Sequence, residues 1–269
     1  MPQARPYARP RKRFGQHFLH DPAVIERIAS AIAPRSAEAL VEIGPGRGAL
    51  TRRLLQSDCG SLDAIEIDRD LAASLRAELG DDVRFALHEA DALAMDFSAL
   101  ARQRSQSLRV VGNLPYNIST PLLFHLLASV RDIQDLHVML QKEVIARMAA
   151  RPGDPAYGRL TVMLSPWVRV EHLFDVGPGA FQPPPQVWSA VARLTVLPQP
   201  AFTVSRAFPA VVAAAFAHRR KTLRNALRGL ASIAQIESCG IDPSARPETI
   251  SPERFNAIAA LTELPPSAA

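Results

Sequence analysis

The first 150 residues alternate between two patterns of apolar positions. Short apolar runs predict strands, and apolar residues spaced three or four apart predict helices. The predicted strands are residues 39–43, 62–67, 83–88, 108–111 and 136–140, and the predicted helices are residues 24–32, 49–56, 70–79, 121–129 and 143–150. Strands and helices that alternate in this way predict an α/β fold built on a mostly parallel, doubly wound sheet.

The pattern changes in the second half of the chain. Residues 160–173 and 187–197 form two long apolar runs that predict strands with no helix between them, the first interrupted by Pro166. We expect these strands at an antiparallel edge of the sheet. The segment Pro198–Pro200 predicts a linker, and only helical patterns and turns follow it.

Length and composition are those of an ordinary globular chain with room for one large domain and one small one. We expect a basic N-terminal arm at residues 1–20, an α/β domain at residues 21–198 and a small all-helical domain at residues 201–269. The two cysteines lie far apart in sequence, with no Cys or His at ligand spacing, so no disulfide framework and no metal site is expected. No secretory signal and no membrane span is predicted, which favours the cytoplasm.

The net charge of +5 is concentrated in two segments. Residues 1–20 and 216–230 each hold five basic residues and no acid, so the rest of the chain carries an excess of five acidic charges. This distribution favours a polyanionic partner such as nucleic acid over a uniformly solvated surface. On an ideal helix over residues 216–230, leucines would face the domain and a basic ridge would face RNA. The basic side chains expected to bind RNA are Arg220, Lys221, Arg224 and Arg228.

The segment Val110–Tyr116 carries the strongest chemical signal. It predicts a buried strand that ends at Gly-Asn-Leu-Pro-Tyr, where open α/β folds place their functional groups. Asn113 offers a side-chain acceptor, and Pro115 forces Leu114 to be extended, which fixes the direction of its backbone carbonyl. Tyr116 offers a face for stacking. Together these three groups are suited to binding an exocyclic amino group on a planar base.

Other strand ends supply groups that suit a nucleotide-like cofactor. The glycines Gly44, Gly46 and Gly48 follow the first strand and allow the backbone to approach a ligand closely. Glu66 ends the next strand, where an acid can accept hydrogen bonds from ribose hydroxyls. Asp91 follows the third strand and could hold an adenine amino group.

Two adenosine-containing cofactors compete for this site. NAD favours a third glycine three residues beyond the second, whereas here it lies two beyond. Glu42, just before the glycines, suits a cofactor that carries positive charge. S-adenosyl-L-methionine carries such charge on its sulfonium and amino groups, and it is the favoured cofactor.

Several motifs resemble those of one family across residues 11 to about 264. They are Arg11–Leu19, Glu42-x-Gly44-x-Gly46, Glu66–Asp70, Asp91, Gly112–Pro121, Leu140–Glu143, Phe181-x-Pro183-x-Pro185-x-Val187 and Arg219–Asn225. In this combination the chain resembles the ribosomal RNA adenine N6-dimethyltransferases, and among them the bacterial small-subunit enzymes most. The resemblance implies a Rossmann-like methyltransferase fold.

The resemblance also implies roles for the matching residues. The implied cofactor contacts are His17, Leu19, Gly44, Glu66, Asp91 and Asn113, and the implied catalytic residues are Asn113, Leu114, Tyr116 and Phe181. Tyr116 and Phe181 would sandwich the target base, and the segment around His17 would close over the methionine end of the cofactor. The family usually has Asn where this chain has His17.

The resemblance further implies the reaction and its setting. The chain would transfer methyl groups to N6 of two adjacent adenosines near the 3′ end of small-subunit ribosomal RNA, as a cytoplasmic monomer acting on the assembling 30S particle. A large-subunit enzyme of the antibiotic-resistance type and an assembly factor without catalysis are the alternatives. A nicotinamide dehydrogenase is disfavoured by the glycine spacing.

Overall fold

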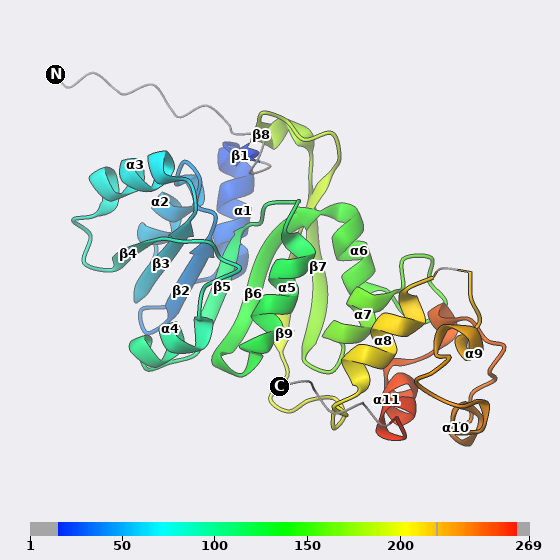
Figure 1. The fold of residues 1–269 in the computed structure, drawn as a ribbon. Helices are drawn as coiled ribbons and strands as arrows, with labels where there is room; N and C mark the ends of the chain where they lie inside the picture. The colour runs from blue at the N-terminus through cyan, green and yellow to red at the C-terminus, as the bar shows by residue number, and fades with distance from the viewer. Residues whose placement is uncertain (1–15, 219, 263–269) are drawn as a thin grey trace. The chain divides into compact units, whose positions relative to one another are not determined.

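The computed structural model describes residues 16–218 and 220–262 (Figure 1). Most of the predicted basic arm lies outside the described residues, and so does Arg219. The chain divides into two compact units, the first within residues 1–145 and 170–196 and the second within residues 146–169 and 197–269.

This division differs from the predicted domain boundaries in one segment. Residues 146–169 belong to the second unit, because Tyr157 and Val162 are part of its hydrophobic core. The Tyr157 hydroxyl also donates a hydrogen bond to the backbone carbonyl of Ile250 at 2.7 Å. The C-terminal unit therefore includes a segment that lies before the last strands of the sheet in the sequence.

The first unit is built on a sheet that has seven strands in the described part of the chain. Its order is β4 (Phe85–Glu89), β3 (Ser61–Glu66), β2 (Ala39–Ile43), β5 (Leu108–Asn113), β6 (Ile133–Gln141), β9 (Ser189–Val196) and β7 (Val168–Val176). The neighbours from β4 to β6 are parallel, and β9 runs antiparallel to β6. The predicted doubly wound sheet with an antiparallel edge is confirmed.

The helices of this unit follow the strands, and all of them except α4 were predicted from the apolar spacing. They are α1 (Pro22–Ile32), α2 (Ala49–Leu55), α3 (Arg69–Leu79), α4 (Phe97–Arg104), α5 (Ser119–Ala128) and, at its boundary, α6 (Lys142–Ala149). Helix α1 begins where the Asp21 carboxylate accepts hydrogen bonds from the backbone of Ala23 and Val24, at 2.8 and 3.2 Å. It ends at Ala33, which adopts a left-handed conformation. Helix α4, capped by Asp96, was not predicted.

The register of the sheet places polar side chains in rows across neighbouring strands. Glu42, Val111, His137 and Arg193 are aligned from β2 through β5 and β6 to β9. Residues two positions apart on a strand share a face, so the row that contains Arg109 and Asp135 lies on the same side. This face of the sheet therefore carries several charged groups within the fold.

The predicted strand at residues 160–173 is wrong in its first half. Residues Arg159–Leu164 form helix α7, and only then does β7 begin. Leu160, Val162 and Leu164 are buried in this helix. An apolar run of this length does not distinguish a strand from a buried helix, and Pro166 separates the two elements.

The second unit is helical in the part of the predicted domain, residues 201–269, that the structure describes. Besides α7 it contains α8 (Phe208–Phe216), α9 (Leu223–Ala226), α10 (Ile233–Ser238) and α11 (Pro252–Ala260). The predicted single helix over residues 216–230 is wrong. The backbone N–H groups of Leu223 and Arg224 instead bond the carbonyls of Ala245 and Pro243, at 2.8 and 3.0 Å.

Three short elements complete the first unit around the site. Strand β1 (Phe18–Leu19) pairs antiparallel with β8 (Phe181–Gln182), which follows the 3₁₀ turn at Pro178–Ala180.

No helix in residues 16–218 and 220–262 is long and apolar enough to cross a membrane. Those residues also bring together no cluster of His, Cys, Asp or Glu side chains suited to a metal ion.

Candidate active site

A cavity lies where the ends of β2, β3, β4 and β5 meet. The space it encloses, about 890 Å³, includes a part that is open to solvent. The predicted residues that line it are His17, Gly44, Glu66, Asp91, Asn113, Leu114 and Tyr116. The strand ends therefore converge as the alternating pattern predicted.

The glycine loop after β2 leaves room on the cavity side. Gly44 and Gly46 have φ angles of +68° and +59°, which side-chain-bearing residues rarely adopt. A Cβ atom on Gly46 would lie 3.0 Å from the ring of Phe18, so a side chain there would crowd the cavity. Gly112, near the end of β5, also cannot carry a side chain, because a Cβ atom there would lie 2.4 Å from the Ile43 carbonyl oxygen.

Glu66 is held rigidly at the end of β3. One carboxylate oxygen accepts from the Gly46 N–H at 3.0 Å and the other from the Asp68 N–H at 2.9 Å. Each oxygen keeps a second lone pair, so ribose hydroxyls could still donate to it. Burial raises the pKa of Glu66, and the two backbone hydrogen bonds oppose that rise.

Asp91 lies just beyond β4 and is exposed. One of its carboxylate oxygens accepts from the backbone N–H of Leu93 at 2.9 Å, which fixes the side chain over the cavity mouth. A second oxygen is available to an amino group. The order of groups along the sheet edge is therefore Asp91, Glu66, the glycine loop and Asn113.

The orientation of Asn113 follows from a single contact. Its Nδ2 donates to the backbone carbonyl of His17 at 2.9 Å. A carbonyl can only accept, so the amide nitrogen faces His17 and Oδ1 is the atom left for a ligand. The side chain thus presents an acceptor to the cavity, which is what a grip on an amino group requires.

Leu114 and Tyr116 are fixed by contacts to the neighbouring strands β6 and β9. The Leu114 N–H donates to the Met139 carbonyl at 3.1 Å, and the Leu114 side chain is buried. The Tyr116 hydroxyl and the Ser189 hydroxyl share a hydrogen bond. Burial raises the pKa of Tyr116, so the phenol stays neutral and its ring can stack.

The residue that lies against Tyr116 is His17. The two rings are stacked with centroids 5.5 Å apart and an interplanar angle of 29°. The His17 Nδ1 also lies 2.8 Å from the Pro183 carbonyl oxygen. Phe181, expected on the other side of a target base, is 2% exposed in the core and does not line the cavity. The structure does not bring Phe181 together with Tyr116, and its role stays a prediction.

A second, smaller cavity lies behind the glycine loop. It shares His17, Phe18, Gly44, Gly46 and Asn113 with the first cavity, so the two meet along this wall. The other lining residues include Leu19, Glu42, Arg47 and His137. Leu19 therefore lies at this cavity rather than at the main one. His137 was missed from the sequence, because nothing in an apolar strand marks one polar residue as part of a site.

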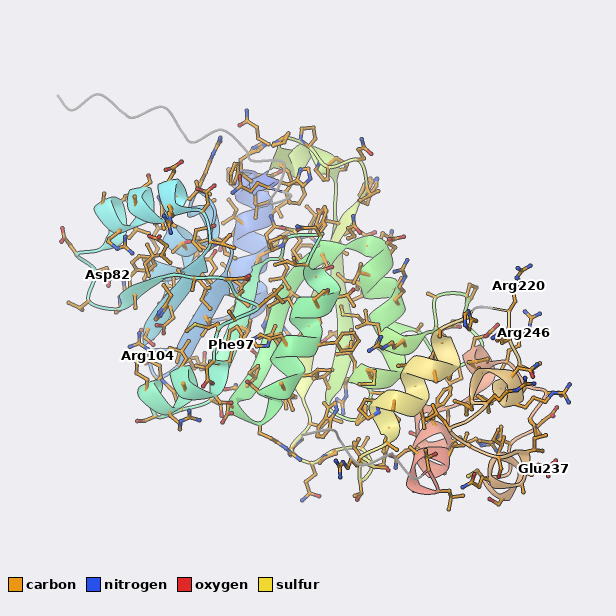
Figure 2. All side chains as sticks on the ribbon, in the orientation of Figure 1. Asp82, Phe97, Arg104, Arg220, Glu237 and Arg246 are labelled. Carbon is orange, nitrogen blue, oxygen red and sulfur yellow. The ribbon has the colours of Figure 1, made fainter. Side chains whose placement is uncertain are left out.

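The basic residues predicted to bind RNA lie in the second unit. Arg220, Lys221, Arg224 and Arg228 are all exposed, whereas Leu223 and Leu227 are buried. The basic side chains of this segment therefore face solvent and its leucines face the core of the unit, as predicted, although the segment does not form one continuous helix. Figure 2 labels Arg220 and Arg246, which both project outward from this unit. Arg246 was missed, because its segment is joined to residues 223 and 224 by tertiary backbone hydrogen bonds, from Leu223 to Ala245 and from Arg224 to Pro243, which leave no signal in the sequence.

A comparison with known protein families matches residues 8–263 to one described as ribosomal RNA adenine dimethylase. The chain belongs to the ribosomal RNA adenine dimethylase family. As a member it is an S-adenosyl-L-methionine-dependent rRNA adenine N6-dimethyltransferase, as its motifs predicted, and an rRNA is its partner.

Relatives of this family member cover nearly its whole length. The ribosomal RNA small subunit methyltransferase A of Pseudomonas aeruginosa is 52% identical over 260 residues, which are 96% of each chain. The protein of the same name from Nitrosococcus oceani is 54% identical and covers 93% of this chain and 95% of its own.

Solved structures share the fold. The 23S rRNA methyltransferase ErmE is 26% identical, with a TM-score of 0.69 over 92% of this chain and 100% of that one. A dimethyladenosine transferase from Plasmodium falciparum is 23% identical, with a TM-score of 0.73 over 90% and 96% of the two chains. Both agree with the Rossmann-like methyltransferase fold.

The residues of this dimethylase family member fit S-adenosyl-L-methionine. Gly46 lines the cavity with a φ angle of +59° that side-chain-bearing residues rarely adopt, and Glu66 and Asp91 present acceptors for hydroxyl and amino groups. The site residues and their individual roles remain predictions, which the experiments below test.

Proposed function

We propose that the chain dimethylates N6 of two adjacent adenosines near the 3′ end of small-subunit ribosomal RNA, giving N6,N6-dimethyladenosine. The relatives that are 52% and 54% identical carry the small-subunit name, whereas the 23S enzyme ErmE is 26% identical. This difference favours the small-subunit substrate over the large-subunit alternative. The orientation of Asn113 is the observation that supports retained catalysis over a binding-only assembly factor.

The chemistry assigned to this chain is mainly positioning. When bound, S-adenosyl-L-methionine supplies an electrophilic methyl group. The Asn113 Oδ1 and the Leu114 carbonyl would accept the two N–H groups of the adenine amine, which favours a pyramidal nitrogen with an available lone pair. Oriented groups and fixed dipoles of this kind lower a barrier without a tuned general base.

The target adenosine must leave its stack to reach the cavity. Tyr116 offers the aromatic face on which a splayed base can rest, as single-stranded RNA sites commonly do. The second methylation leaves one N–H to hold, so one of the two acceptors must then tolerate a methyl group. The exposed basic residues of the second unit would contact phosphates.

The biological setting is part of the proposal. We propose that the substrate is the RNA within an assembling 30S particle, and that the chain acts in the cytoplasm as a monomer. The basic patch supports a large polyanionic substrate. Sedimentation of the chain with and without unmethylated small subunits would test both the particle and the monomer.

Transfer of labelled methyl groups tests the substrate. Purified chain and S-adenosyl-L-methionine are incubated with unmethylated small subunits or with large subunits. Label is expected in small-subunit RNA, as dimethyladenosine at two neighbouring positions. Label in large subunits alone would support the resistance-type alternative, and binding without transfer would support an assembly factor.

The Asn113→Ala variant is the matched control for catalysis. It should cut methyl transfer by orders of magnitude and leave RNA binding and folding close to those of the parent, because it removes the amine acceptor and, besides it, one hydrogen bond to the His17 carbonyl. Turnover within about threefold of the parent, under ~1 kcal/mol of barrier, would contradict the role of Asn113.

A further inference from the structure

One side-chain hydrogen bond joins two segments of the first unit that lie far apart in the sequence. The Tyr116 hydroxyl, in the loop after β5, shares it with the hydroxyl of Ser189, the first residue of β9. Ser189 is 0% exposed. The motif that begins at Phe181 ends at Val187, two residues earlier, so the family resemblance gives Ser189 no role.

The Ser189 hydroxyl depends on this one contact. Within residues 16–218 and 220–262 its only hydrogen-bond partner is the Tyr116 hydroxyl. A buried hydroxyl is normally paired, because leaving it unpaired costs free energy. The bond therefore fixes the tip of the Tyr116 side chain as well as Ser189 itself.

Tyr116 is held at both of its ends. Strand β6 lies between β5 and β9 in the sheet, so the phenol reaches across the end of β6 to bond Ser189. At the backbone end, the Ser119 hydroxyl at the start of α5 donates to the Tyr116 carbonyl at 3.1 Å. A ring that is held at both ends cannot change its side-chain rotamer without breaking one of these bonds.

The angle of this ring matters because Tyr116 is the predicted stacking face for the target adenine. Phe181, the other aromatic residue predicted for that role, is in the core. The ring that lies on Tyr116 in this structure is that of His17, with centroids 5.5 Å apart. A misplacement of about 1 Å can slow a reaction by about 100-fold, so the orientation of the phenol ring bears directly on the rate.

We propose that Ser189 is a positioning residue for methyl transfer, which holds the Tyr116 ring at the angle at which the target adenine stacks beside Asn113. This inference rests on the proposed function, because it takes Tyr116 as the stacking face. Ser189 itself lines neither of the two cavities, so it acts only through Tyr116.

Two substitutions remove the same hydrogen bond from its two ends. Ser189→Ala removes one hydroxyl, and Tyr116→Phe removes the other but keeps the aromatic ring. Single-turnover methyl transfer to unmethylated small subunits, at saturating S-adenosyl-L-methionine, should slow by about tenfold in each variant. The double variant should also be about tenfold slower, because both changes remove one shared bond and their effects do not add. Calorimetric affinity for the cofactor should not change in Ser189→Ala.

Urea denaturation of the same variants separates positioning from a structural role. Each single variant leaves one hydroxyl without its partner and should lower the urea midpoint, whereas the double variant removes both hydroxyls and should recover toward the parent. If Ser189 served only stability, transfer would recover together with the midpoint. We expect the midpoint to recover while transfer stays slow.

Tyr157→Phe is the matched control. It removes a buried tyrosine hydroxyl from the second unit, where that hydroxyl donates to the Ile250 carbonyl at 2.7 Å. This variant should lower the urea midpoint and keep the parent's rate of transfer.

Three results would overturn the positioning role of Ser189. They are transfer by Ser189→Ala within about threefold of the parent, recovery of transfer in the double variant, and a decrease of about a hundredfold in the double variant, which would make the two effects independent. Absence of methyl transfer by the parent would instead contradict the proposed function itself.

Discussion

At the residue scale, Glu42 and Glu66 show how two buried carboxylates at neighbouring strand ends differ. Both oxygens of Glu66 accept backbone N–H groups, whereas Oε2 of Glu42 has no partner among the described residues. Hydrogen bonds from N–H groups favour a carboxylate, and burial without them favours the acid. Burial raises the pKa of both carboxyl groups, and it raises that of Glu42 to about 7.

The raised pKa of Glu42 predicts how stability depends on pH without a cofactor. Between the ordinary value of 4.5 and about 7 the folded chain binds more protons than the unfolded one, so stability falls as pH rises through this window. The contribution of Glu42 should reach about 3 kcal/mol at higher pH. Urea denaturation of the parent and of Glu42→Gln across this range measures it, and the variant should gain stability relative to the parent as pH rises.

Glu78→Gln is the control for that comparison. Glu78 is on the surface beside Arg52, and the hydrogen bond from Arg52 lowers its pKa, so its effect should be small and of opposite sign. A difference between Glu42→Gln and the parent that stays constant from about pH 4 to pH 8 is the result that contradicts the prediction.

His17 gives a second prediction at this scale. Its backbone carbonyl, which holds Asn113, survives a change of side chain, whereas its ring lies on Tyr116. His17→Asn, the usual family residue, should therefore keep methyl transfer within about threefold of the parent. Steady-state methylation of small subunits measures this, and a decrease as large as that of Asn113→Ala would show that the imidazole itself is required.

The sequence could predict which side chains converge at the cavity, but not all of their neighbours. Glu66, Asp91 and Asn113 follow apolar strands, and parallel strands bring such positions to one edge. The burial of Phe181 depends instead on the pairing of β1 with β8, each two residues long. Elements this short leave no periodic signal, so the contact between His17 and Tyr116 could not be predicted.

At the element scale, the parallel strands carry a buried ionic network under α1. Arg109 of β5 donates to Asp135 of β6 at 2.9 Å, to Glu38 at 2.6 Å and to the Ile32 carbonyl at the end of α1 at 2.7 Å. Burial raises the pKa of Asp135, but the neighbouring His137 and Arg109 together outweigh burial, so the net shift is downward. One guanidinium thus links two strands, the loop before β2 and a helix end.

Removal of Arg109 should destabilise the chain strongly. Arg109→Met leaves the buried carboxylate of Asp135 and the partly exposed one of Glu38 without their cation, and breaking a buried pair by removing one partner typically costs about 3–5 kcal/mol. Urea denaturation at neutral pH measures the change in stability. The control Arg102→Met removes an exposed guanidinium 3.9 Å from Asp96 and should change stability by at most about 1 kcal/mol. Equal effects of the two variants would contradict a structural role for the network.

The secondary-structure prediction was wrong at residues 159–164, because the spacing of apolar residues there does not distinguish a helix from a strand. Residues 159–164 and the following strand form one apolar stretch in the sequence, and a helix buried on most sides shows no polar face. The segment 216–230 failed for the opposite reason. It has good helical periodicity, but tertiary hydrogen bonds from Leu223 and Arg224 to residues 245 and 243 replace a continuous helix.

At the scale of the whole molecule, we propose that cofactor binding and RNA binding are divided between the two units. The first unit carries the cavity and its acidic groups, and the second carries the exposed basic residues that are predicted to bind RNA. A division of this kind separates affinity for the RNA backbone from recognition of the reacting base. Cofactor binding and RNA binding should therefore respond to different substitutions.

Reversing charge at Arg220, Arg224 and Arg228 together tests this division. For every phosphate that the variant no longer neutralises, the slope of log affinity against log salt should fall by about 0.7–0.9, because fewer counterions are released on binding. Binding to unmethylated small subunits should weaken, whereas calorimetric affinity for S-adenosyl-L-methionine should not change, because the cofactor cavity is lined by the first unit alone.

A matched triple reversal makes the outcome specific to this patch. Arg69, Arg76 and Arg102 are exposed on the first unit, and their reversal changes net charge by the same amount. If the basic patch binds RNA, only the first triple variant loses most of its salt dependence, while the second shows a smaller, general weakening from repulsion. If both variants bind subunits with the parent's affinity across a salt series, the RNA contact lies elsewhere, and the basic residues from Arg5 to Arg13 become the next segment to reverse.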